Sequence, residues 1–470
     1  MSIIQKIKGK SFLDLFWSFS DNILQQVINF VVGIILARIL LPEEFGLIGI
    51  ITVFIAISIV FVDGGFSAAL INKKEVTDVD YNTVFYTNIS ISCFVYLIIF
   101  LSADWIAAFF KIQQIADLLR ILGINILLIS LSSIHRTIIV RNLNFKIITF
   151  VSIVAVSISA VCAIYMAYHG YGVYSLVFRV LIGEVVTIIL FWYVNKWRPS
   201  FLFSTESFKS MFSYGINLFL SNLLNTLNTN IYYIVIGKFF SASQLGYFTR
   251  ATAFRDLSST NISNTIKRVS FSTLSKIFDK KEQIRKFNFF VNITFLSTCF
   301  SMLLLFFGAK EIILILLDEK WLPSVEILKI MSISGVFLAL YNQNLDYLAV
   351  LGKTKRYLTI EIFGKFLVIP IIFVGIVYGF KIFLFALVVQ NLLMFLIVLF
   401  QLNFIESGFF SKQIKLILEF AIMFFILFII DQYYPVFFLN MYFTLMIKFG
   451  IVLLLVVGFN FTRLKYLLKK

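Results

Sequence analysis

Several arginines lie inside long apolar stretches of this sequence, and three of them are candidates for binding chemistry: Arg179, Arg250 and Arg255. An arginine buried in an apolar segment is costly unless water or a counter-charge accompanies it. Its planar guanidinium group can form two parallel hydrogen bonds with the oxygens of a phosphate group. We therefore predict that these cations bind an anionic substrate.

Nearby carboxylates leave a structural role open for the same arginines. Asp256 follows Arg255 directly, and Asp21 and Glu184 lie in other apolar stretches. An arginine that pairs with one of these carboxylates would hold helices together, and its removal would harm folding instead of binding.

Uncharged polar residues recur at helical spacing in two of the apolar stretches, so that each stretch carries a polar stripe on one face. Such stripes are typical of a water-filled cleft, although hydrogen bonding between helices is the alternative. We predict that both stripes, with the acidic residues beside them, line one cavity. The lining residues are Asp21, Asn22, Gln25 and Asn29 in the first stretch, and Ser221, Asn222, Asn225 and Asp256 in the later ones.

The elements that position these residues follow from the composition. Apolar residues make up 60% of the 470 residues, charged residues only 14%, and the mean hydropathy is +0.97. A membrane-spanning helix needs roughly 20 mostly apolar residues, and about fourteen such segments can be found. The predicted spans are 16–40, 45–62, 82–104, 116–139, 147–168, 172–194, 211–239, 245–272, 288–308, 325–350, 358–378, 381–403, 414–431 and 438–460.

Lysine and arginine fall in alternate connections between these spans, as they do when cationic loops stay in the cytoplasm. The cationic connections include Lys73 and Lys74, Lys280 and Lys281, and Lys353, whereas the connection from Gly308 to Pro323 carries the acidic residues Glu311, Asp318 and Glu319. This pattern places both termini in the cytoplasm. The net charge of +16 then arises mostly from loops that face anionic lipid headgroups, and we expect no nucleic-acid partner.

The two halves of the chain resemble each other at an offset of 200 residues. Glu44 to Leu47 aligns with Gln244 to Tyr247, and Asn22 aligns with Asn222. The first spans of the two copies are six helices apart, an even number, so both copies insert in the same orientation. We predict an all-α polytopic membrane protein with two pseudo-symmetric six-helix lobes around a central cavity, plus two C-terminal helices. The predicted boundaries are 1–200, 201–405 and 406–470.

The sequence contains no recognisable catalytic constellation. Gly352, Lys353 and Thr354 match only the end of a phosphate-binding loop, because Tyr347 stands where its first glycine belongs. The two histidines lie in different segments and away from any cysteine or carboxylate cluster, so we expect no metal. We therefore predict a transporter without catalytic residues or cofactors.

Several loop motifs resemble one family of transporters. They are Leu41 to Gly49 (LPEEFGLIG), Phe61 to Ile71 (FVDGGFSAALI), Tyr81 to Tyr86 (YNTVFY), Ile236 to Phe239 (IGKF), Leu245 to Ala251 (LGYFTRA) and Glu319 to Ser324 (EKWLPS). The chain is similar in these motifs to the Wzx-like oligosaccharide flippases, of the colanic-acid-exporter type, within the multidrug/oligosaccharidyl-lipid/polysaccharide (MOP) exporter superfamily.

The resemblance implies alternating access and a location in the bacterial inner membrane. It implies a polyprenyl-diphosphate-linked oligosaccharide as substrate, on the way to lipopolysaccharide O-antigen, capsule or exopolysaccharide. Arg179, Arg250 and Arg255 would then be the diphosphate-binding cations. Partners would be membrane lipids and other polysaccharide-assembly membrane proteins. A multidrug antiporter of the same superfamily and a membrane glycosyltransferase or polymerase remain the alternatives.

Overall fold

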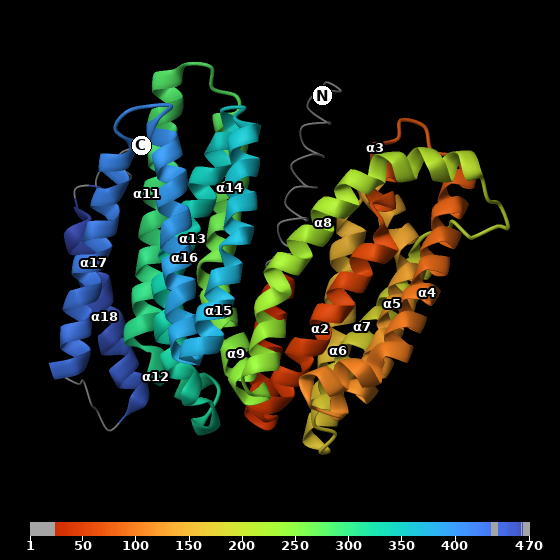
Figure 1. The fold of residues 1–470 in the computed structure, drawn as a ribbon, viewed down its shortest axis with the longest axis horizontal. Coiled ribbons are helices and arrows are strands. Elements are labelled where there is room, and N and C mark those ends of the chain that lie inside the picture. Colours follow the sequence, from red (N-terminus) through yellow and green to blue (C-terminus); the bar gives the residue numbers. More distant parts are fainter. Residues whose placement is uncertain (1–23, 434–439, 462, 464–470) are drawn as a thin grey trace, which may run out of the picture. The chain divides into compact units, whose positions relative to one another are not determined.

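The computed structural model describes residues 24–433, 440–461 and 463, and its contacts divide the chain into two compact units, Met1–Gly246 and Tyr247–Lys470. Figure 1 shows that both units are built from helices joined by short connections. No strand occurs among the described residues. The predicted all-α fold class is confirmed.

Unit 1 begins, within the described residues, with the helix Leu24–Ile39. Seven more helices follow it before the unit ends inside α9, which starts at Ala242. They are α2 (Pro42–Asp63), α3 (Phe66–Asn72), α4 (Asp78–Phe110), α5 (Gln114–Arg141), α6 (Phe145–Tyr168), α7 (Val173–Val194) and α8 (Thr205–Phe239).

Unit 2 contains the rest of α9 (Ala242–Ser258) and the remaining helices. They are α10 (Thr260–Leu274), α11 (Lys280–Phe307), α12 (Ala309–Leu316), the 3-10 helix η1 (Glu319–Trp321), α13 (Pro323–Val350), α14 (Thr354–Phe366), α15 (Val368–Tyr378), α16 (Phe380–Asn403), α17 (Phe409–Tyr433) and α18 (Met441–Phe459).

Eleven helical segments among the described residues are long and apolar enough to cross a membrane, and each coincides with a predicted span. The other three predicted spans also fall on helices. The first is described only from Leu24, and α8 and the α9–α10 pair carry the polar residues discussed above. The helices least like ordinary membrane spans are therefore the ones predicted to line a cavity.

Two predicted spans are interrupted in the structure. The span 245–272 breaks between α9 and α10 at Ser259, whose side chain donates to the carbonyl oxygen of Gly335 at 2.7 Å. The span 358–378 breaks after Phe366, because Pro370 has no N–H with which to bond the Phe366 carbonyl four residues earlier. Neither break was predicted, although Thr354–Tyr378 remains one segment long and apolar enough to cross a membrane.

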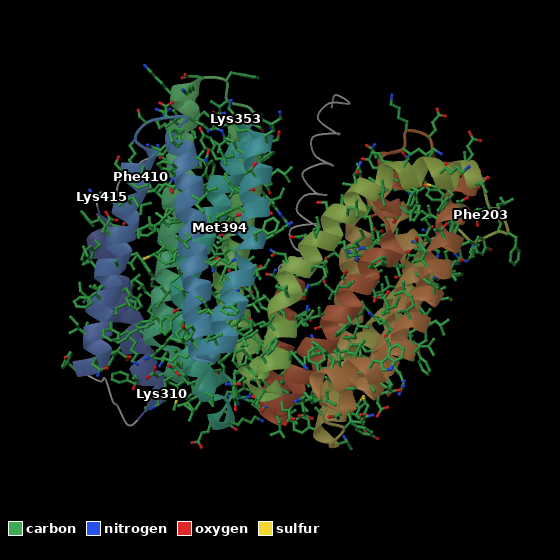
Figure 2. All side chains as sticks on the ribbon, in the orientation of Figure 1. Phe203, Lys310, Lys353, Met394, Phe410 and Lys415 are labelled. Atoms are coloured by element: carbon green, nitrogen blue, oxygen red, sulfur yellow. The ribbon has the colours of Figure 1, made fainter. Side chains whose placement is uncertain are left out.

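A segment predicted as a connection contains helix. The acidic connection from Gly308 to Pro323 holds α12 and η1, and Trp321 within it is completely buried. Figure 2 shows Lys310, at the start of α12, toward one end of the unit 2 helices, and Lys353, after α13, toward the other end. Helix α12 therefore begins toward one end of the unit 2 helices, and the cationic connection that contains Lys353 lies toward the opposite end.

Helix α8 packs on α2, α3 and α4 and follows a curved path across unit 1 (Figure 1). Its closest approach is at Gly215, which faces Gly65 at the start of α3: a Cβ on Gly65 would lie 2.4 Å from the carbonyl oxygen of Gly215. Only glycine permits this backbone contact, and Gly65 also has a positive φ of 79°. The contacts place α8 in unit 1, while the predicted lobe boundaries at 200 and 405 remain a prediction about the sequence repeat.

Candidate substrate-binding surfaces

Two predicted site residues from distant parts of unit 1 meet directly. Arg179, half-buried on α7, donates through Nη2 to Oδ1 of Asn29, on the helix Leu24–Ile39, at 2.5 Å. Glu184, the nearest candidate counter-charge on α7, instead accepts from the Ser132 hydroxyl at 2.5 Å. Arg179 is therefore held by a neutral amide, which orients the guanidinium and leaves its charge uncompensated by that contact.

The described residues include only part of the first polar stripe. Gln25 is half-buried and Asn29 is exposed on their helix, whereas Asp21 and Asn22 lie outside the described residues. The exposed position of Asn29 leaves it open on the side away from Arg179.

The second polar stripe lies on α8 and is open to its surroundings. Ser221, Asn222 and Asn225 are all exposed. Among the described residues the structure gives their side chains no hydrogen-bond partner, whereas Asn230 further along bonds the Thr226 carbonyl of its own helix at 2.8 Å. Hydrogen bonding between the helices that the structure describes therefore does not account for this part of the stripe. Its amide and hydroxyl groups are available to a polar ligand.

In unit 2, Arg255 pairs with its neighbour Asp256. The Arg255 Nη2 and Nε atoms lie 2.7 and 2.8 Å from Asp256 Oδ1, and the Thr260 hydroxyl donates to the same oxygen at 3.4 Å. The Arg255 side chain is 16% exposed and that of Asp256 is 44% exposed. The pair that the sequence left open therefore exists, and one carboxylate orients the guanidinium at the α9–α10 break.

Gly335 of α13 packs closely against the side chain of Arg255. A Cβ on Gly335 would lie 3.4 Å from Arg255 Cγ and 2.4 Å from Met302 Sδ. The carbonyl of Gly335 also receives the Ser259 hydroxyl that marks the helix break. Arg250 lies on α9 one and a half turns before Arg255 and is half-buried.

Comparison with known proteins places this arrangement in a family. Residues 35–326, more than half of the chain, match the family described as polysaccharide biosynthesis protein. The chain belongs to the polysaccharide biosynthesis protein family. Relatives include the teichuronic acid biosynthesis protein TuaB of Bacillus subtilis, which is 27% identical over 63% of this chain and 62% of its own length. The lipopolysaccharide biosynthesis protein WzxC of Escherichia coli is 23% identical over 76% of this chain and 74% of its own length.

The alignment with TuaB covers just under two thirds of the length of TuaB. The solved structures align with a larger share of this chain than TuaB does. The lipid II flippase MurJ in an inward closed conformation shares 19% identity with a TM-score of 0.76, over 97% of this chain and 100% of the other. An inward-facing multidrug transporter of the MATE family shares 15% identity with a TM-score of 0.61, over 83% of this chain and 94% of the other. The fold is therefore that of the MOP superfamily, as the loop motifs predicted.

The protein also contains a partly buried ionic network that was not predicted from its sequence. Lys448 of α18 lies 2.9 Å from Glu311 of α12 and 3.8 Å from Asp431 of α17, and Asp431 lies 2.5 Å from Lys329 of α13. Lys448 also donates to the Phe307 carbonyl at 2.9 Å. A single lysine inside the apolar span 438–460 was the available signal. Two cations and two carboxylates balance one another and join α17 and α18 to α12 and α13 within unit 2.

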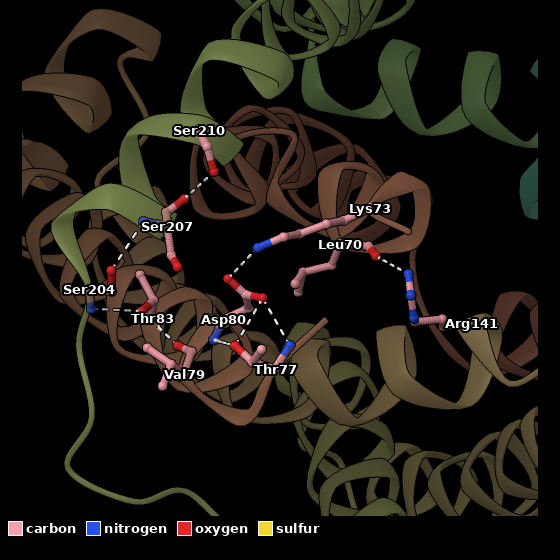
Figure 3. A network of polar contacts seen from close by, with 10 residues as sticks. All are labelled: Leu70, Lys73, Thr77, Val79, Asp80, Thr83, Arg141, Ser204, Ser207 and Ser210. Carbon is pink, nitrogen blue, oxygen red and sulfur yellow. Dashed lines mark hydrogen bonds and ion pairs between the residues drawn. The ribbon is translucent and has the colours of Figure 1, made fainter. Parts of the chain in front are cut away.

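A second unpredicted network lies where α3, α4 and α8 begin or end (Figure 3). Asp80 is 1% exposed and accepts from Lys73 Nζ at 2.7 Å and from the Thr77 amide at 2.9 Å. The amide of Ser204, at the start of α8, donates to the Thr83 hydroxyl of α4 at 3.0 Å. These bonds fix the first turn of the helix that carries the exposed polar stripe.

Proposed function

We propose that this protein is a flippase that moves a polyprenyl-diphosphate-linked oligosaccharide across the bacterial inner membrane by alternating access. The product would serve the synthesis of a surface polysaccharide such as O-antigen, capsule or exopolysaccharide. The observation that carries the proposal is the family match together with the fold of a lipid flippase. The exposed polar stripe on α8 adds support, because sugars bind amide and hydroxyl groups.

In this proposal the arginines bind the diphosphate and the stripes bind the sugars. Arg255 would turn from Asp256 toward the phosphate oxygens, with Arg250 and Arg179 adding positive charge. Burial of a diphosphate is costly unless fixed cations replace its water. Gln25, Asn29, Ser221, Asn222 and Asn225, with Asp21, Asn22 and Asp256, would line the cleft between two six-helix lobes, 1–200 and 201–405, with helices 406–470 outside them.

The proposed location is the inner membrane with both termini in the cytoplasm. The alternation of cationic connections supports this orientation. The positions of Lys353 and Lys310 at opposite ends of the unit 2 helices agree with it (Figure 2).

The alternatives differ in chemistry. A multidrug antiporter shares the fold, but an exporter of organic cations needs acidic groups in its cavity, whereas the cations at Arg179 and Arg255 favour an anionic substrate. A membrane glycosyltransferase would form glycosidic bonds when incubated with a sugar donor and a lipid-linked acceptor. We propose that this protein forms none.

The direct test uses purified protein in liposomes that contain a fluorescent polyprenyl-diphosphate-linked oligosaccharide. A quencher that cannot cross the membrane reports how much lipid remains in the inner leaflet. We expect the protein to equilibrate the leaflets, whereas empty liposomes should keep their asymmetry. A rate equal to that of empty liposomes would refute the proposal, and efflux of an organic cation instead would favour the antiporter.

A further inference from the structure

Unit 1 contains an elongated apolar cavity of about 590 Å³ between α2, α4 and α8. Seven phenylalanines line this α2–α4–α8 groove. Its two hydroxyl groups are both satisfied within their own helices: Ser58 donates to the Phe54 carbonyl at 2.8 Å, and Ser102 donates to the Ile99 carbonyl at 3.3 Å. The groove therefore offers a ligand only apolar contacts, which suit a hydrocarbon chain.

The shape of the groove follows the axis of α4. Its lining residues on α4 run from Ile91 to Ile106, which at 1.5 Å per residue corresponds to about 22 Å. Half of a hydrocarbon bilayer is only about 15 Å thick. A fatty acyl chain confined to one leaflet would leave part of the groove empty, whereas a longer isoprenoid chain could fill it.

The groove is open along its side. Phe94, Ile98 and Phe212 all line it, and they are 64%, 49% and 44% exposed. A chain could therefore enter sideways from the surrounding hydrocarbon without any helix moving away.

One cation lies next to a lining residue at one end of the groove. Phe208 lines that end, and Lys209, the next residue of α8, is exposed. Figure 3 shows the start of α8 beside Lys73, whose side chain is 37% exposed although it pairs with Asp80. The exposed Lys209 therefore stands beside the apolar walls at the Phe208 end of the groove.

We propose that the α2–α4–α8 groove binds the isoprenoid chain of the lipid-linked substrate. This inference rests on the proposed function and adds to it the place where the lipid part of the substrate docks. Helix α8 carries the groove residues from Phe208 to Phe219 on one face and the exposed Ser221 and Asn225 on another. The same helix would therefore hold the chain and present the polar stripe to the sugars.

The test uses the full-length protein in lipid nanodiscs and a long-chain polyprenyl diphosphate with a photoreactive diazirine in its isoprenoid chain. After irradiation, mass spectrometry locates the labelled residues. Unlabelled polyprenyl diphosphate should compete for the labelling, whereas diacyl phosphatidic acid, a phosphate lipid with acyl chains, should not. Ile98→Trp fills the groove, and Leu97→Trp is the matched control, because Leu97 is 53% exposed on α4 and does not line the groove.

We expect labelling on α2, α4 and α8, reduced about tenfold by Ile98→Trp and unchanged by Leu97→Trp, with both variants melting as the wild type does. Polyprenol, which keeps the isoprenoid chain but lacks phosphate, should also compete for the labelling. Labelling elsewhere, or equal competition by phosphatidic acid, would overturn the inference. Flipping by the wild type is measured in parallel, so that loss of the groove site and loss of the proposed function give different results.

Discussion

Gly46 of α2 and Gly246 of α9 make reciprocal contacts, although they are 200 positions apart. A Cβ on Gly46 would lie 1.8 Å from the carbonyl oxygen of Ala242, and a Cβ on Gly246 would lie 1.8 Å from the carbonyl oxygen of Pro42. Pro42 and Ala242, the first residues of α2 and α9, are separated by the same 200 positions. The predicted repeat at an offset of 200 residues therefore coincides with a symmetric backbone contact between the starts of α2 and α9.

Gly46→Ala and Gly246→Ala should each force the two helix starts apart. Overpacking of this kind costs roughly 1–3 kcal/mol, and we expect a lower melting temperature for both variants in detergent. Gly450→Ala is the control, because a Cβ there meets nothing within 4 Å and alanine favours the helix. If both test variants melted like the control, the close contact would not contribute to stability.

The substrate role of Arg255 predicts a graded loss of transport. Arg255→Ala should impair flipping more than Arg255→Lys, which keeps the charge but loses the two-pronged geometry. Asp256→Asn should leave the arginine in place with less orientation, and its effect should be the smallest of the three. The flipping assay with matched amounts of folded protein measures all of them.

A structural role for the same arginine predicts something different. If Arg255 only pairs with Asp256, then Arg255→Ala should lower expression and thermal stability together with transport. A stable Arg255→Ala protein that flips lipid-linked oligosaccharide at the normal rate would remove this residue from the site.

The membrane spans could be predicted because apolar length is a local property of the sequence. The polar stripe on α8 could be predicted as well, since its residues recur at helical spacing, whereas the partners of Lys448 could not. The break at Pro370 had a sequence signal, but the break at Ser259 did not, because it depends on a bond to Gly335 of another helix. The pairing of Arg179 with Asn29 likewise depends on tertiary packing across 150 positions.

The network around Asp80 predicts a difference between two neighbouring carboxylates. Asp80→Ala would leave Lys73 and the Thr77 amide without their acceptor, and we expect a loss of about 1–3 kcal/mol. Asp78 is exposed, two residues earlier, in the first turn of α4. Apart from the loss of its favourable interaction with the helix dipole, Asp78→Ala should change stability by less than about 0.5 kcal/mol. Thermal unfolding of both variants provides the comparison, and equal losses would contradict the importance of burial at Asp80.

The ionic network of α18 predicts that two substitutions together do less harm than one. Lys448→Met alone leaves Glu311 buried without its cation, which should cost about 3–5 kcal/mol. Adding Glu311→Leu removes the orphaned charge, and Lys329 still pairs with Asp431 in the double variant. We therefore expect the double variant to melt closer to the wild type than the single variant does. A double variant less stable than Lys448→Met would mean that Glu311 has another essential partner.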